Sequence, residues 1–187
     1  MQISKRRESI TQAMANYGFE GDVICQLEEI EKKVKTYSAR KRMFAEKFDE
    51  LLTEEQRLSL WEYGGMCTGG ETGARAKKFA KELTGSLAEK VAHLNESGQF
   101  YKVELNEDGT ITAYCGCHCL QYRIDKPDKE DVKLREKIPS AYGCAAGAAF
   151  HNIKKALGVN ARIKSIDYPQ KGDGRNYMPF VIEVIEG

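Results

Sequence analysis

The chain has 187 residues, of which 41% are hydrophobic and 30% charged, with a formal net charge of +1. This length and composition suit one domain with a real hydrophobic core. The small net charge gives no basic excess, so nucleic acid is not a predicted partner. No run approaches the ~18 apolar residues of a membrane span, and the start lacks a long apolar segment. We therefore expect a cytoplasmic protein without a membrane partner, in which thiols stay reduced.

The first half of the chain shows helical periodicity. Helices are predicted over residues 8–18, 22–37, 38–52, 74–83 and 86–94, and a further helix is predicted to begin at residue 53. Two of them begin with a capping-box pattern, at Thr53 and at Ser86. Cys25 lies among apolar residues at helical spacing, so we expect it in the core. These features define a helical region over residues 1–98.

The second half, residues 99–187, changes period. Two short β-patterned runs flank Asp108 and Gly109, which predicts a hairpin. A helix is predicted next, with Ser140 as N-cap and Gly158 as C-cap, followed by strands over 161–168 and 177–186. The expected fold class is α+β: N-terminal helices packed with a four-stranded, mainly antiparallel sheet in β-β-α-β-β order. We expect the two regions to form one compact domain.

The stretch "CGCHC" holds Cys115, Cys117 and Cys119 together with His118. On a regular strand the three thiols would share one face, with neighbours ~6.5–7 Å apart. A single zinc ion needs sulfurs closer than that, because Zn–S bonds are ~2.3 Å long. A bend at Gly116 or a larger iron–sulfur cluster would remove the difficulty. The alternative is that these cysteines are small buried residues of the core.

Two further cysteines stand next to glycines. Cys144 falls in the first turn of the predicted helix, where the helix dipole favours a thiolate. Cys67 lies in the glycine-rich stretch "GGMCTGGETG", just ahead of a helix. The small residues around Cys144 allow close approach of either a ligand or a packed neighbour. His151 lies two turns beyond Cys144, so the two cannot form a dyad.

Our leading hypothesis is a metal-binding protein with a redox, sensing or small-ligand role. An iron–sulfur cluster is favoured and zinc is the alternative, because the thiols are dispersed and no C-x-x-C knuckle is present. The candidate ligands are Cys67, Cys115, Cys117, Cys119 and Cys144, with His118 as a substitute. A second hypothesis is a cysteine-dependent hydrolase or small-molecule-binding enzyme. In it Cys144 is the nucleophile and His118 the base. A third is an interaction domain with a cysteine-rich core.

The C-terminal half also carries a family-like pattern. A cysteine strand precedes "PSAYGCAAGAAFHNIKKALG", and "RIKSIDYPQKGDG" and "PFVIEV" follow. Over roughly residues 100–187 this resembles the vinyl-reductase and L-2-amino-thiazoline-4-carboxylate hydrolase-like group of small α/β domains. The resemblance implies a small-molecule or metal binder, with hydrolase activity in some members. In that group a cysteine often precedes the phenylalanine of the last strand, where this chain has Met178 and Pro179.

Overall fold

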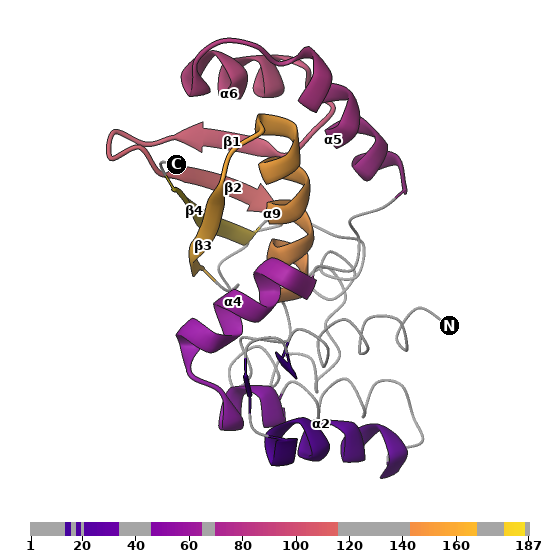
Figure 1. The fold of residues 1–187 in the computed structure, drawn as a ribbon. Coiled ribbons are helices and arrows are strands. Elements are labelled where there is room, and N and C mark those ends of the chain that lie inside the picture. The colour runs from indigo at the N-terminus through magenta and orange to yellow at the C-terminus, as the bar shows by residue number, and fades with distance from the viewer. Residues whose placement is uncertain are drawn as a thin grey trace, which may run out of the picture.

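The computed structural model describes residues 14–15, 18–19, 21–33, 46–64, 70–115, 143–167 and 178–185. Figure 1 shows how its helices and strands are arranged. In chain order they are α2 (Gly21–Lys33), α4 (Glu54–Gly64), α5 (Gly70–Glu82), α6 (Leu87–Glu96), β1 (Lys102–Leu105), β2 (Ile111–Cys115), α9 (Gly143–Leu157), β3 (Ala161–Ile166) and β4 (Met178–Val184). Residues 46–51 are also helical. The order of helices first and β-β-α-β-β second confirms the predicted α+β fold.

The four strands form one sheet in the order β1-β2-β4-β3, and every neighbouring pair is antiparallel. The β1–β2 hairpin turns through Asp108 and Gly109, as predicted, and Gly109 has a φ of +80°. A side-chain oxygen of Asp108 accepts a hydrogen bond from the backbone N–H of Thr110 at 3.0 Å. Such an aspartate–glycine pair suits the turn because the aspartate satisfies a backbone donor and glycine tolerates positive φ.

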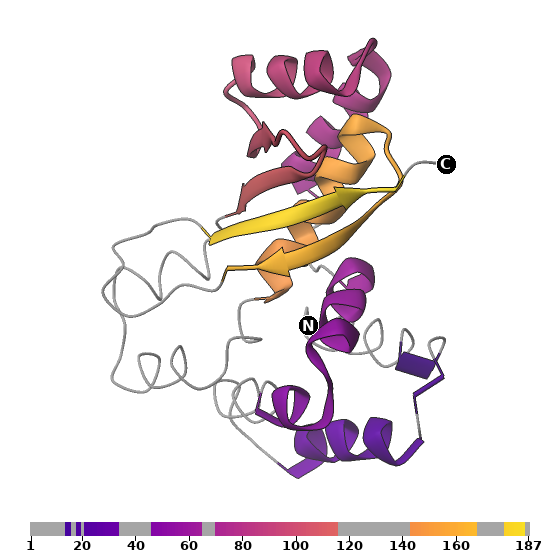
Figure 2. The same cartoon turned by 90° about the vertical axis from the view of Figure 1, so that its left-hand side faces the viewer.

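One face of the sheet is covered by α9, which lies behind β3 and β4 in Figure 2. Every residue from 145 to 150 is buried, because α9 also packs against α4 and α5. The alternating burial of β2 and β4 places Ile111, Ala113, Phe180 and Ile182 in the core. The helix-facing side of the sheet and α9 therefore form the centre of the molecule.

Local sequence signals set several helix ends. The Ser86 hydroxyl accepts the backbone N–H of Glu89, and the Glu89 carboxylate accepts the backbone N–H of Ser86. Thr53 and Gln56 make the equivalent reciprocal pair before α4. At the end of α9, Gly158 has a φ of +66° and donates its backbone N–H to Lys154 O. Each of these three signals was readable from the sequence. Ser140 lies outside the described residues.

The prediction that Cys25 lies in the core was wrong, since its side chain is exposed. On α2 the fully buried residue is Leu27, with Val23 and Ile24 packed partly against the core. Cys25 is two residues before Leu27, which places it about 200° away around the helix. Helical spacing to apolar neighbours therefore did not put Cys25 on the buried face.

Both edge strands of the sheet are capped by side chains from helices. The Asn95 amide of α6 donates to Val103 O of β1 at 2.7 Å and accepts the Val103 N–H at 3.1 Å. On the other edge, the carboxylate of Glu62 from α4 accepts the backbone N–H of Ile163 in β3. Exposed edge groups are templates for pairing with other chains. These contacts satisfy some of them within the domain.

Candidate functional site

Cys115 is the last residue of β2 and points to the helix-covered side of the sheet. It is 1% exposed, and its Sγ lies 3.4 Å from the backbone oxygen of Met178, the first residue of β4. A thiol in that position donates a weak hydrogen bond and packs as a small apolar group. This is the environment expected for a core cysteine, the alternative that the sequence left open for "CGCHC".

Cys144 lies in the first turn of α9, next to Gly143. The start of α9 is held by α4, because a Cβ placed on Gly143 would lie 2.7 Å from Cδ1 of Trp61 and closer still to Nε1 and Cε2. Trp61 itself is 5% exposed and packs its ring against Phe48, with centroids 5.2 Å apart. The end of α4 and the beginning of α9 are therefore in direct contact.

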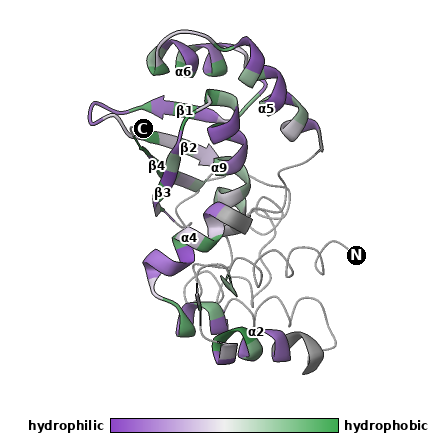
Figure 3. Ribbon diagram, in the orientation of Figure 1, coloured by the Kyte–Doolittle hydropathy of each residue, from purple (hydrophilic) through white to green (hydrophobic). Residues whose placement is uncertain are grey.

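The small side chains of α9 that the structure describes pack in the core. Ala145, Ala146 and Ala149 belong to the same buried core as the strands and the other helices. Figure 3 shows α9 pale and green in its first turns and mixed purple and green in its second half. The run of small residues thus lets a central helix be surrounded closely by α4, α5 and the sheet, rather than opening a ligand cavity among these residues.

Four of the predicted site residues lie outside the described part of the chain: Cys67, Cys117, His118 and Cys119. Of the predicted site residues, the structure describes Cys115 and the backbone of Cys144. Among the described residues, no group of three or more histidine, cysteine, aspartate or glutamate side chains is arranged to hold a metal ion. The metal site therefore stays a prediction.

A concave site that the sequence did not indicate lies along the second half of α9. It is a cavity of about 590 Å³ lined by residues of α4, α9 and the turn that follows α9: Glu62, Phe150, His151, Lys154, Lys155, Gly158 and Val159. The pattern His-x-x-Lys-Lys near a helix end is visible in the sequence. Glu62 is 101 positions from its bonded partner Ile163, so no local pattern could have placed it there.

The charged groups of this cavity perturb one another. Burial raises the pKa of the Glu62 carboxyl above 4.5, although the Ile163 N–H and the cations Lys154 and Arg162 oppose that shift. Burial lowers the pKa of His151 below 6.5, and the positive charges of Lys155 and Lys154 lower it further. At neutral pH the cavity therefore presents a largely neutral imidazole beside two ammonium groups.

No described helix of this protein is long and apolar enough to cross a membrane. No protein-family model, no curated protein and no solved structure matches the chain. The functional argument consequently stands on the residues and their arrangement alone.

Proposed function

We propose that this protein is a cytoplasmic metal-binding protein in which cysteine thiolates hold an iron–sulfur cluster, with zinc as the alternative metal. The ligands in this proposal are Cys67, Cys117, Cys119 and Cys144, with His118 as a substitute for one of them. Four cysteines are the usual ligand set of a cluster. Bound there, the metal would supply a redox or sensing centre, or a site for a small ligand.

The observation that carries the proposal is the contact between the end of α4 and the beginning of α9. Cys67 is three residues beyond Gly64, the last residue of α4, and three residues of chain reach at most about 11 Å. Cys144 directly follows Gly143, which packs on Trp61 of the same α4. The lengths of chain involved therefore allow Cys67 and Cys144 to reach one site.

The end of β2 supplies the other two thiols. Cys117 and Cys119 follow Cys115 by two and four residues, so both lie within about 14 Å of it. The end of β2 and the start of β4 pair at one end of the sheet. In Figures 1 and 2, α9 begins near that same end. A cluster spreads its ligands more widely than a single zinc ion, which suits thiols arriving from three segments.

We assign Cys115 to the core rather than to the ligand set. Its thiol is buried and directed at Met178 O, and a thiolate there would face a carbonyl oxygen without a proton to donate. By contrast, the first turn of α9 offers free backbone N–H groups that stabilise a thiolate. The five candidate cysteines are thus divided into four ligands and one packed residue.

The test is oxygen-free purification, followed by iron, sulfide and zinc analysis and a visible spectrum. We expect iron and sulfide with a broad absorption near 400 nm, or one zinc per chain under the alternative. Cys144→Ser should lose most of the metal, whereas Cys115→Ala and the exposed-site control Cys25→Ser should keep it. A folded, colourless, metal-free wild type would refute metal binding, and metal loss in Cys115→Ala alone would refute the division of roles.

The position of Cys144 also supports a second candidate function, that of a thiol hydrolase. A thiolate in the first turn of α9 is a potential nucleophile, and the helix N-terminus could stabilise an oxyanion. His118 is the base in this reading, since His151 lies seven residues along the same helix, about 10 Å away. Iodoacetamide should then modify Cys144 faster than the exposed Cys25. Labelling of Cys144 no faster than Cys25 in metal-free protein would contradict it.

A further inference from the structure

The cavity at the end of α9 is the strongest unassigned feature of the described residues. Its volume of about 590 Å³ falls within the range of small-molecule sites. Phe150 and Val159 supply its apolar lining, and charged side chains reach it from two helices. It lies along the second half of α9, and none of the candidate cysteines is among its lining residues, so it is distinct from the metal site proposed above.

Two of its polar side chains are already engaged within the protein. Glu62 accepts the backbone N–H of Ile163. The Lys154 ammonium lies 3.4 Å from Ala161 O and 5.7 Å from the centre of the Phe150 ring. These contacts hold Glu62 and Lys154 at the walls of the cavity and limit their freedom to move.

Two other polar side chains have no such contact. Within the described part of the chain, neither Lys155 nor His151 makes a hydrogen bond or an ion pair, and both are exposed at the cavity. With Glu62 ionised and His151 neutral, two ammonium groups and one carboxylate leave the lining with a single positive charge. The lining thus combines one net positive charge, free N–H donors and an apolar surface.

We propose that this cavity binds a small molecule with one carboxylate and an apolar body. The carboxylate pairs with Lys155 and accepts a hydrogen bond from His151, while the apolar body lies against Phe150 and Val159. A carboxylate is the natural partner of these groups because charge-assisted hydrogen bonds are stronger than neutral ones. One negative charge also matches the single net positive charge of the lining.

The proposal has a definite pH dependence. Among the described residues, Lys155 and Lys154 act on the charge of His151, and Glu62 is the acidic residue that lines the same cavity. As the pH falls, His151 gains a positive charge and Glu62 loses its negative charge, so an anion binds more tightly. By linkage, a bound carboxylate raises the pKa of His151 above its value in the free protein.

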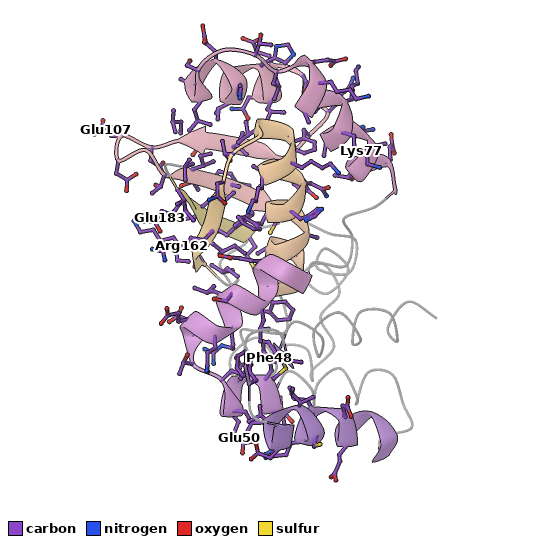
Figure 4. All side chains as sticks on the ribbon, in the orientation of Figure 1. Phe48, Glu50, Lys77, Glu107, Arg162 and Glu183 are labelled. Atoms are coloured by element: carbon purple, nitrogen blue, oxygen red, sulfur yellow. The ribbon has the colours of Figure 1, made fainter. Side chains whose placement is uncertain are left out.

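The experiment uses benzoate as the probe and benzamide as its uncharged control. Binding to the full chain is followed by NMR through the His151 imidazole, whose signal is assigned by its loss in His151→Gln. Lys155→Gln removes the free ammonium, and Lys77→Gln is the matched control on the exposed side of α5 (Figure 4). Circular dichroism checks that each variant is folded.

We expect benzoate to shift the His151 signal and raise its pKa, and to bind more tightly at about pH 6 than at about pH 8. Benzamide should bind at least about tenfold more weakly, and Lys155→Gln should weaken benzoate binding at least about fivefold, with no change in Lys77→Gln. The proposal is overturned if benzoate leaves His151 unchanged at about 20 mM, since that limit excludes even weak fragment-like binding. It is also overturned if benzamide binds equally well, or if the two lysine variants behave alike. Preferential binding of inorganic phosphate over benzoate would likewise refute the assignment to carboxylates.

Discussion

Replacement of Gly143 by alanine tests the contact that joins α9 to α4. A Cβ at this position would lie 2.7 Å from Cδ1 of Trp61 and closer to two other indole atoms. Real Cβ atoms do not approach that closely, so either the ring or the helix must move. Trp61 has little room to move, since it is 5% exposed and packed against Phe48.

The expected cost follows from two opposing effects. Overpacking of a core position destabilises a protein by about 1–3 kcal/mol. Alanine recovers up to about 1 kcal/mol over glycine in a helix, and less at its first residue. We therefore expect Gly143→Ala to lower the free energy of unfolding by about 1–2 kcal/mol. For a chain of this length that corresponds to a fall in Tm of roughly 2–8 °C.

The assay is urea and thermal unfolding followed by far-ultraviolet circular dichroism. Gly21→Ala is the matched control, because Gly21 is also the first residue of a described helix but has no atom within 4 Å of its ideal Cβ. We expect that variant to be neutral or slightly stabilised. A second control is Trp61→Leu, which removes Nε1 and Cε2, the two indole atoms nearest to the new methyl group.

The double variant provides the decisive comparison. If the clash is the cause, Gly143→Ala should cost much less in the Trp61→Leu background, with a coupling energy of about 1 kcal/mol or more. The reasoning is refuted if Gly143→Ala is as stable as the wild type, or if the two substitutions are simply additive.

Three further predictions concern an edge strand, an acid-sensitive cap and a pair of thiols. Asn95→Ala should destabilise the fold by about 1–3 kcal/mol in urea unfolding and increase aggregation, because Val103 loses both of its hydrogen bonds to the Asn95 amide; unchanged stability would contradict this role. Hydrogen bonds from the backbone and hydroxyl of its N-cap serine lower the pKa of Glu89. The stability that results is present above the unfolded-state pKa and lost as the pH falls through the lower folded-state pKa. Glu89→Gln should flatten that part of the acid unfolding curve, and an unaltered curve would count against it. Finally, in metal-free protein iodoacetamide should modify Cys25 in the native state and Cys115 only after unfolding, as read by mass spectrometry of digested protein; equal rates would show that the burial of Cys115 is wrong.

Elements governed by neighbours in the sequence could be predicted. The capping boxes at Thr53 and Ser86, the aspartate–glycine turn and the glycine stop of α9 all depend on residues within a few positions of one another. Their hydrogen bonds form wherever that short segment adopts its preferred backbone. The spacing of apolar residues changes from a helical period in the first half to a strand period in the second. This change predicted the α+β class, because each period places the apolar side chains of one element on a single face that can be buried.

Tertiary structure decided the features that depend on distant residues. The exposure of Cys25 depends on which side of α2 meets the core. In the sequence, the apolar residues around Cys25 did not show which side of the helix that would be. The capping of the edge strands by Asn95 and Glu62 required knowledge of which helix lies beside which strand. The role of Gly143 depended on Trp61, 82 positions earlier, reaching the start of α9. In each case the stabilising energy comes from contacts between segments that are far apart in the sequence. A sequence pattern predicts that a residue is buried, but it does not predict which distant residue contacts it.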